Sequence, residues 1–440
     1  MLKGTLWLIL YLQVMALPLL VGLLSPGDAA GRPWASQLTS ALGYCGLTIV
    51  LLELALVSKI RWISGLFGQD ALLRFHRRMG ILGVVLLVLH AVLALMGGYP
   101  LSWLNPLNPE SPGPMRWGVV STLFLLVLVG LSLTRRTLRL SYEMWEVSHG
   151  ALADLALAAA FVHALLFGTY AQQRPMAILL QVYAATALAL RIWFRFVRPA
   201  MLWFKPWVVL RNTAERGASR TLLLKPLGHP GFTFEPGQFA WLITGSTPFH
   251  WDRHPISMSS AAPDETGHEI AFTIKDLGDW SGGVVPLIAP GQRVWVDGPH
   301  GVFTADRQQG AGYVFIAGGS GIGPLFSMVR TLSARGDARP LLLIFGCRTP
   351  ESITFREEIE QLRLSHNLKV VYVVENAPPD WTGERGQVNG ALLRKHLPPK
   401  FARYQFFVCG PEAMMDAVEK DLGELGVPAD HVQTERFVMV

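Results

Sequence analysis

Apolar residues dominate the chain from its start to about Phe204, and they fall into six runs separated by short polar segments. Each run is about 20 residues long, the length that a helix needs to cross the hydrocarbon core of a bilayer. After Phe204 the pattern changes to short segments in which apolar and polar residues alternate. The sequence therefore predicts six transmembrane helices followed by a soluble half. The runs lie near residues 5–24, 39–58, 76–97, 117–134, 146–168 and 176–194.

Basic residues gather at one set of ends of these runs, in residues 59–78, 135–139 and 191–205. By the positive-inside rule these ends face the cytoplasm, so we predict a multi-pass cell-membrane protein with both termini cytoplasmic. The first run also fits a signal peptide, although it is longer than the usual apolar region of one. Cleavage would leave five spans and the same cytosolic C-terminal half.

Composition excludes two classes of function. The net charge of +6 comes largely from residues that flank the apolar runs, so it does not indicate nucleic-acid binding. Three widely separated cysteines, Cys45, Cys347 and Cys409, are too few for a disulfide framework or an iron–sulfur cluster. Any redox chemistry must therefore use other cofactors.

Four of the twelve histidines lie in the membrane half, His76 and His90 in the third run and His149 and His163 in the fifth. A single histidine in a membrane helix is often a hydrogen-bonded core residue or a proton relay. Here, however, each pair is separated by 14 residues, which turn a helix through about 1400°, close to four full turns, and rise about 21 Å. Each helix therefore presents two imidazoles on one face, at matched depths. We predict two stacked bis-imidazole sites that suit two haem b groups better than zinc or copper.

The soluble half contains two patterns, which divide the chain into three predicted domains: 1–204, 205–307 and 308–440. Short alternating segments punctuated by Pro-Gly turns predict an antiparallel β-barrel, with strands near 220–225, 238–244, 269–275 and 293–297. Strands that alternate with helices then predict a doubly wound parallel α/β sheet, with strands near 313–317, 341–345, 368–374 and 405–409.

A glycine-rich segment follows the first strand of the α/β part and opens a helix. Glycines let the backbone approach a pyrophosphate, and a helix N-terminus favours its charge. A plain tight turn would carry similar glycines, but the position between strand and helix favours a dinucleotide. The residues concerned are Gly318, Gly319, Gly321, Gly323 and Pro324.

Three motifs in the soluble half resemble those of the NADPH oxidase/ferric reductase superfamily, and the order of barrel and nucleotide fold is similar to ferredoxin–NADP reductases. His254-Pro255-Ile256-Ser257 resembles the flavin motif of that superfamily, and Gly278-Asp279-Trp280-Ser281 resembles its flavin-pyrophosphate turn. Cys409-Gly410-Pro411 resembles the segment beside the nicotinamide. Together with the histidine pairs, the resemblance covers nearly the whole chain.

The resemblance implies roles for single residues. His254 and Ser257 are expected to contact FAD, with Ser257 at the reactive flavin edge, and Gly278 and Ser281 to hold its diphosphate. Phe437 resembles the aromatic residue that covers the flavin until nicotinamide displaces it, although three residues follow it here. The chain departs from plant-type members at Ile256, where those have a tyrosine. The expected flavin and nicotinamide residues are His254, Pro255, Ile256, Ser257, Gly278, Trp280, Ser281, Cys409, Gly410 and Pro411, in addition to the glycine segment.

Arg348 follows the second α/β strand, where such folds select the adenosine ribose, and a guanidinium there favours a 2′-phosphate. We therefore expect NADPH, with NADH as the alternative. The predicted function is electron transfer from NAD(P)H through FAD and two haems to an extracytoplasmic acceptor. The outer loops are short and weakly charged, which favours O2 and superoxide formation over a ferric chelate. An electron carrier for a quinone or protein partner is a third alternative, and no obligatory protein subunit is predicted.

Overall fold

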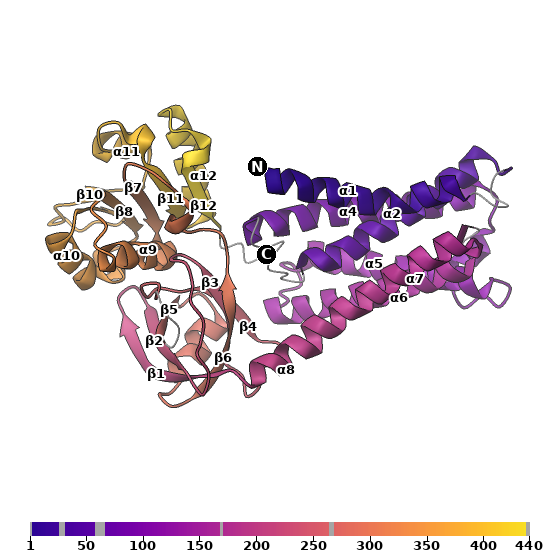
Figure 1. Cartoon of the computed structure of the whole chain (residues 1–440), viewed down its shortest axis with the longest axis horizontal. Coiled ribbons are helices and arrows are strands. Elements are labelled where there is room, and N and C mark those ends of the chain that lie inside the picture. Colours follow the sequence, from indigo (N-terminus) through magenta and orange to yellow (C-terminus); the bar gives the residue numbers. More distant parts are fainter. Residues whose placement is uncertain (1, 26–30, 58–66, 168–169, 264–267, 437–440) are drawn as a thin grey trace. The chain divides into compact units, whose positions relative to one another are not determined.

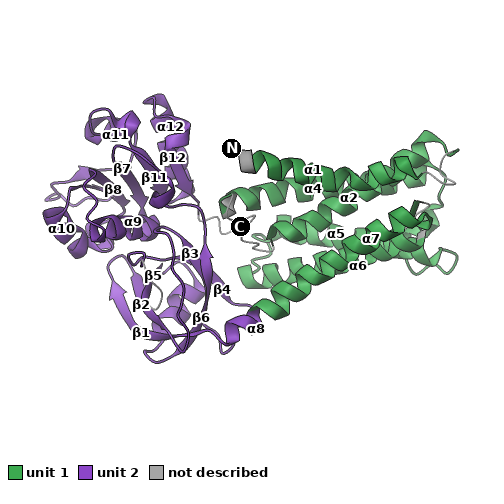
Figure 2. Cartoon of the chain, viewed as in Figure 1, with its two compact units in different colours: residues 1–198, 440 green, residues 199–439 purple. Residues whose placement is uncertain are grey.

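The computed structural model describes residues 2–25, 31–57, 67–167, 170–263 and 268–436 (Figure 1). The chain forms two compact units, Met1–Arg198 and Pro199–Met439 (Figure 2). The division precedes the predicted boundary at 204/205 by a few residues. The last long helix, α7 (Arg174–Ile192), continues through a π-helical turn (Trp193–Val197) into α8 (Arg198–Trp203), so helical structure runs across the division.

Unit 1 is a helical bundle, and its helices lie side by side in Figure 1. Six helices among the described residues are long and apolar enough to cross a membrane, which confirms the six predicted spans. Several start earlier than the apolar runs, because residues such as Arg74 are polar yet helical. The helices before α7 are α1 (Leu2–Leu24), α2 (Trp34–Val57), α4 (Gln69–Met96), α5 (Gly113–Thr134) and α6 (Tyr142–Phe167).

The bundle buries one apolar stripe and exposes another. Tyr44 and Leu51 of α2 pack with Phe161 of α6 and Leu180 of α7 in one cluster of buried side chains. Many other large apolar side chains of these helices are exposed, for example Leu89, which is 44% exposed. Exposed apolar surface of this extent is expected where helices face lipid instead of water.

Unit 2 begins with a six-stranded antiparallel sheet whose strands follow the order β4-β3-β6-β1-β2-β5. Met258, just after β4, forms a bridge with Phe272 of β5. The two edge strands therefore meet, and the sheet curls around one core that includes Trp207, Leu222 and Phe272. The strands are β1 (Pro206–Glu215), β2 (Ser219–Pro226), β3 (Phe239–Ile243), β4 (Arg253–Ser257), β5 (Ile270–Lys275) and β6 (Arg293–His300).

The second sheet is parallel throughout, in the order β10-β9-β8-β7-β11-β12, and helices cover both of its faces. Successive side chains of a strand point to opposite faces. Accordingly, Phe315 of β7 packs in the cluster that contains α9, whereas Val314 packs in the cluster that contains α12. This is the predicted doubly wound arrangement. The strands are β7 (Tyr313–Gly318), β8 (Leu341–Cys347), β9 (Leu368–Val374), β10 (Glu384–Arg385), β11 (Gln405–Cys409) and β12 (Val432–Glu435), and the helices are α9 (Ile322–Ala334), α10 (Arg356–Ser365), α11 (Gly390–His396) and α12 (Glu412–Glu424).

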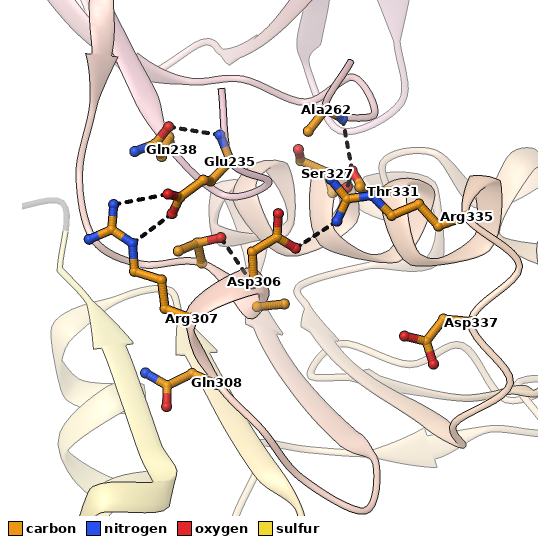
Figure 3. A network of polar contacts seen from close by, with 12 residues as sticks. Glu235, Gln238, Ala262, Asp306, Arg307, Gln308, Ser327, Thr331, Arg335 and Asp337 are labelled. Carbon is orange, nitrogen blue, oxygen red and sulfur yellow. Dashed lines mark hydrogen bonds and ion pairs between the residues drawn. The ribbon is translucent and has the colours of Figure 1, made fainter. Parts of the chain in front are cut away.

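Side chains of α9 join the two sheets of unit 2 (Figure 3). The hydroxyl of Thr331 accepts a hydrogen bond from the backbone N–H of Ala262 at 2.8 Å, and the hydroxyl of Ser327 donates to a barrel carbonyl at 2.7 Å. At the end of α9, Arg335 forms an ion pair with Asp306 at 2.7 Å. Because Ser327 and Thr331 are almost fully buried, these bonds are shielded from water and hold the barrel against the parallel sheet.

Candidate functional site

The four membrane histidines form two facing pairs in unit 1. The ring centroids of His76 and His149 are 6.2 Å apart, and those of His90 and His163 are 6.1 Å apart. All four come from α4 and α6, the helices on which the 14-residue spacing was found. The first pair lies near the ends where α4 and α6 begin, and the second lies four turns further along.

The His90–His163 pair is oriented by backbone carbonyls. Nδ1 of His90 lies 2.7 Å from the carbonyl oxygen of Thr39, and Nδ1 of His163 lies 3.0 Å from that of Pro114. A carbonyl oxygen only accepts hydrogen bonds, so Nδ1 must carry the proton in both rings. An imidazole in this tautomer presents an unprotonated Nε2, which is the form that binds a metal.

Two glycines make room for these rings. A Cβ at Gly43 of α2 would lie 2.8 Å from Nδ1 of His90, and one at Gly118 of α5 would lie 2.9 Å from Nδ1 of His163. Any other residue at either position would push the ring away from the carbonyl that orients it. The helices next to α4 and α6 thus approach closely enough to set the ring positions.

The His76–His149 pair has side-chain partners. Nδ1 of His149 lies 3.1 Å from the hydroxyl of Ser132 on α5. Nδ1 of His76 lies 2.6 Å from Oε2 of Glu53 on α2, although the contact is not aligned as a hydrogen bond. Tyr11 of α1 donates a hydrogen bond of 3.3 Å to the other carboxylate oxygen of Glu53. We did not predict a role for Glu53, but an acidic residue within an apolar run is a signal that the sequence contains.

The geometry of both pairs fits a haem iron between two imidazoles. A metal–nitrogen bond is about 2 Å and a ring centroid lies roughly 1 Å behind the nitrogen, so two histidines that share one metal have centroids about 6 Å apart. Both measured separations match this value.

The predicted flavin motif forms β4, which pairs with β3 of the barrel. His254 stacks on Trp280, with ring centroids 3.6 Å apart, and also contacts the carboxylate of Asp252. Trp280 donates a hydrogen bond of 3.1 Å to the hydroxyl of Thr244. The two sequence motifs, separated by more than twenty residues, are thereby brought together on one side of the barrel.

Ser257 and the pyrophosphate turn have features that fit FAD. The hydroxyl of Ser257 is buried and has no hydrogen-bond partner among the described residues. A buried polar atom of this kind usually has a partner in the complete complex. Within the turn, Ser281 accepts hydrogen bonds from the N–H groups of Leu277 and Gly278, which fixes its shape. Apart from its two chain neighbours, no described residue has a heavy atom within 4 Å of a Cβ position on Gly278, so that part of the described chain leaves the backbone there open to a ligand.

The glycine segment connects β7 to α9, as predicted, and packs against the Cys409-Gly410-Pro411 segment. A Cβ at Gly321 would lie 2.1 Å from the carbonyl oxygen of Cys409, and one at Gly318 would lie 2.7 Å from Pro411. Glycine is therefore required by close packing at both positions. The N-cap of α9 makes no side-chain hydrogen bond, although the N–H of Ile322 already donates to the carbonyls of Gly319 and Ser320 in the preceding turn.

Strand registers link Ser257 to Cys409 within unit 2. Ser257 pairs with Phe239 of β3, and a Cβ at Gly301, just after β6, would lie 3.2 Å from that phenylalanine and 3.6 Å from Glu435. Glu435 in turn pairs with Cys409. Burial first, and the carboxylate of Glu435 second, raise the pKa of the Cys409 thiol well above its usual value. Cys409 is therefore a neutral thiol and not a nucleophilic thiolate.

The nicotinamide side contains one residue that sequence reasoning missed. Nζ of Lys275, at the end of β5, lies 3.5 Å from the Cβ position of Gly319. Its position next to the helix N-terminus suits a pyrophosphate, and no short motif marks it. Arg348 is exposed at the end of β8, as its place in the sequence implied. Phe437 lies outside the described residues.

Comparisons with known proteins match both halves of the chain. Residues 42–160 match the ferric reductase like transmembrane component family, and residues 315–420 match the oxidoreductase NAD-binding domain family. Ferredoxin–NADP reductase B of Sorangium cellulosum is 33% identical over 217 residues, which are 47% of this chain and 86% of that protein. The reductase component of propane 2-monooxygenase from Rhodococcus jostii is 31% identical over 225 residues, 49% of this chain and 59% of that protein.

Solved structures show a partial likeness to the chain. The flavohem-like FAD/NAD binding domain of nitric oxide dioxygenase from Vibrio cholerae has a TM-score of 0.47 and 22% identity, and the match covers 53% of this chain and 98% of that domain. The transmembrane family match and the reductase relatives assign the two halves separately. The chain therefore belongs to the ferredoxin–NADP reductase family in its C-terminal half and carries a ferric reductase-like transmembrane component in its N-terminal half, which makes it a membrane oxidoreductase of the NADPH oxidase/ferric reductase superfamily.

Proposed function

We propose that this protein transfers electrons from cytosolic NADPH, through FAD and two bis-histidine haem b groups, to O2 on the opposite side of the membrane, with superoxide as the product. One observation carries the proposal. Two histidine pairs with centroid separations of 6.2 and 6.1 Å lie four turns apart in a chain that also contains a ferredoxin–NADP reductase-type half. When bound, the flavin accepts two electrons as hydride and releases them singly, and the haems relay single electrons.

In the soluble unit, the chain's task is to hold the nicotinamide against the flavin. The N-terminus of α9 and Lys275 bind the NADPH pyrophosphate through N–H groups and one positive charge. Cys409, a neutral and fully buried thiol, lines the nicotinamide position without adding a negative charge there. Arg348 selects the 2′-phosphate from the exposed end of β8.

On the flavin side, the role of Ser257 is to donate the proton of its hydroxyl group in a hydrogen bond. Its buried hydroxyl donates a hydrogen bond to the reactive edge of the flavin, which satisfies an atom that has no partner in the described chain. The stacked pair of His254 and Trp280 forms a wall beside the same ligand. Backbone N–H groups near Gly278 face its diphosphate, where no side chain intervenes.

In the membrane unit, the histidines hold and orient both metals. If the two imidazoles of each pair held one haem iron, no position on that iron would be left for an acceptor, and the haem would supply electron transfer without binding the acceptor at the metal. This requirement suits O2, which needs no dedicated docking surface. Glu110 is the only charged residue between positions 97 and 112, so this outer loop offers little to a charged ferric chelate. The basic ends of α4, α5 and α7 face the cytoplasm by the positive-inside rule.

The decisive experiment uses the purified full chain reconstituted in nanodiscs with FAD and haem. We expect two low-spin haems per chain, and NADPH-driven reduction of cytochrome c that superoxide dismutase abolishes. Rapid anaerobic reduction of a ferric chelate together with dismutase-insensitive cytochrome c reduction would instead identify a ferric reductase. A well-folded chain that binds no haem would refute the proposal. His90→Ala should remove one haem and leave flavin reduction by NADPH intact.

A further inference from the structure

The four histidines do not have equivalent partners. Three of them direct Nδ1 at a neutral oxygen, either a backbone carbonyl or a hydroxyl. His76 alone among them contacts a carboxylate, with its Nδ1 2.6 Å from Oε2 of Glu53. The side chain of Glu53 is 7% exposed and lies in a membrane helix. Burial of a carboxylate in such an environment is costly, so its position beside one haem ligand calls for a physical role.

A carboxylate at this point acts on the charge of the metal site. Oxidised bis-imidazole haem carries one more positive charge than the reduced form. A negative charge on the far side of one imidazole would stabilise the oxidised form more, and the Glu53 side chain, at 7% exposure, is little screened by solvent. A haem held by His76 and His149 would therefore hold its electron less tightly than one held by His90 and His163, whose Nδ1 atoms contact backbone carbonyls.

We propose that Glu53 sets the order of the two reduction potentials, by making the His76–His149 site the lower of the two. Electrons then run downhill from this site to the His90–His163 site. The first site is at the end of the bundle where α6 begins and α7 ends, and the chain continues from there through α8. This inference rests on the proposed function, and Glu53 acts as a positioning residue through His76.

Tyr11 moderates the same charge. Its hydroxyl donates a hydrogen bond of 3.3 Å to Oε1 of Glu53 and is contributed by α1, which carries no haem ligand. Removal of this donor leaves more of the negative charge directed at His76. Glu53→Gln and Tyr11→Phe should therefore shift the same potential in opposite directions, an outcome that general damage to the bundle would not produce.

The test is a potentiometric titration of purified protein, followed by visible absorbance, in the His90→Ala background where only the haem of His76 and His149 remains. Adding Glu53→Gln should raise its midpoint potential, with roughly a tenfold or larger shift in the reduced-to-oxidised ratio at a fixed potential, which equals 59 mV for one electron. Adding Tyr11→Phe should lower it, and Glu53→Asp should recover part of the wild-type value. Ser132→Ala, which removes a neutral partner of His149, serves as the control and should shift the ratio much less.

A Glu53→Gln potential equal to the parent's, or a shift no larger than that of Ser132→Ala, would overturn the inference. If Glu53→Gln lost the haem, the Tyr11→Phe variant would test the inference instead. An unchanged or higher midpoint potential of its haem would contradict the charge argument. In the two-haem protein, Glu53→Gln should move only one of the two components. Wild-type protein that lacks both haems would instead refute the proposed function, and that result is distinct from all of these.

Discussion

Replacement of Gly118 by alanine tests whether the helix next to α6 sets a metal-ligand position. The new Cβ would lie 2.9 Å from Nδ1, 3.0 Å from Cε1 and 3.1 Å from Cγ of His163. Because comfortable contacts between such atoms are about 3.5 Å, the ring must move by roughly 0.5 Å. That movement would strain the 3.0 Å hydrogen bond from Nδ1 to the carbonyl oxygen of Pro114.

The expected magnitude follows from overpacking, which costs about 1–3 kcal/mol in a packed interior. Applied to the ligand-bound state, this corresponds to a loss of about 5- to 150-fold in affinity for the haem of His90 and His163. Gly43→Ala should act in the same way on His90, because its Cβ would lie 2.8 Å from Nδ1 of that ring.

Gly130→Ala on the same helix is the matched control, because no heavy atom lies within 4 Å of its Cβ position. Replacing glycine by alanine favours the helix by about 1 kcal/mol at either position. Any difference in haem content between the two variants therefore reports on contact with the ring. The measurement is haem content per chain after dialysis, with redox titration of what remains. We expect two haems in the control and selective loss of one in Gly118→Ala. Equal haem content and equal potentials in the two variants would refute the reasoning.

Three further predictions concern unit 2. Ser257→Ala should leave the thermal unfolding temperature unchanged or higher, because the buried hydroxyl has no hydrogen-bond partner among the described residues. The same change should slow flavin reduction by NADPH roughly a hundredfold in stopped-flow measurements. An unchanged rate would exclude a role at the flavin. Gly321→Ala places a Cβ 2.1 Å from the carbonyl oxygen of Cys409, so unfolding in urea should show a loss of about 3 kcal/mol or more, and a wild-type midpoint would contradict the packing. The hydrogen bond from Arg339 lowers the pKa of Asp337, so the pair stabilises the fold above the unfolded-state pKa of about 3.9, and this stability is lost as the pH falls through the folded-state pKa. Asp337→Asn should therefore lower the melting temperature at pH 7 but not near pH 2, and equal losses at both would argue against this pair.

Sequence reasoning recovered the strands of the parallel sheet well, because each is a continuous apolar run between turn signals. For β7, β8, β9 and β11 the predicted and observed positions differ by at most two residues at either end. The strands β10 and β12 of the parallel sheet, and β1 and β4 of the antiparallel sheet, are not among those predicted. In β4 the residues Arg253–Ser257 show no alternation, and they become a strand through pairing with β3. Pairing of this kind depends on a neighbouring strand, which the residue pattern of β4 alone does not reveal.

For the candidate site, the sequence by itself determined which residues carry the chemistry. Helical periodicity places His76 and His90 on one face, and strand–glycine–helix order marks the dinucleotide loop, because both are properties of a single segment. The tertiary structure alone decided how these residues are held: the carbonyl of Thr39, the space at Gly118 and the carboxylate of Glu53 all come from neighbouring helices. The physical reason is the distance along the chain over which each property is set. Helical phase is set within a few residues, whereas the partner of each Nδ1 is set by packing between helices that are far apart in the chain.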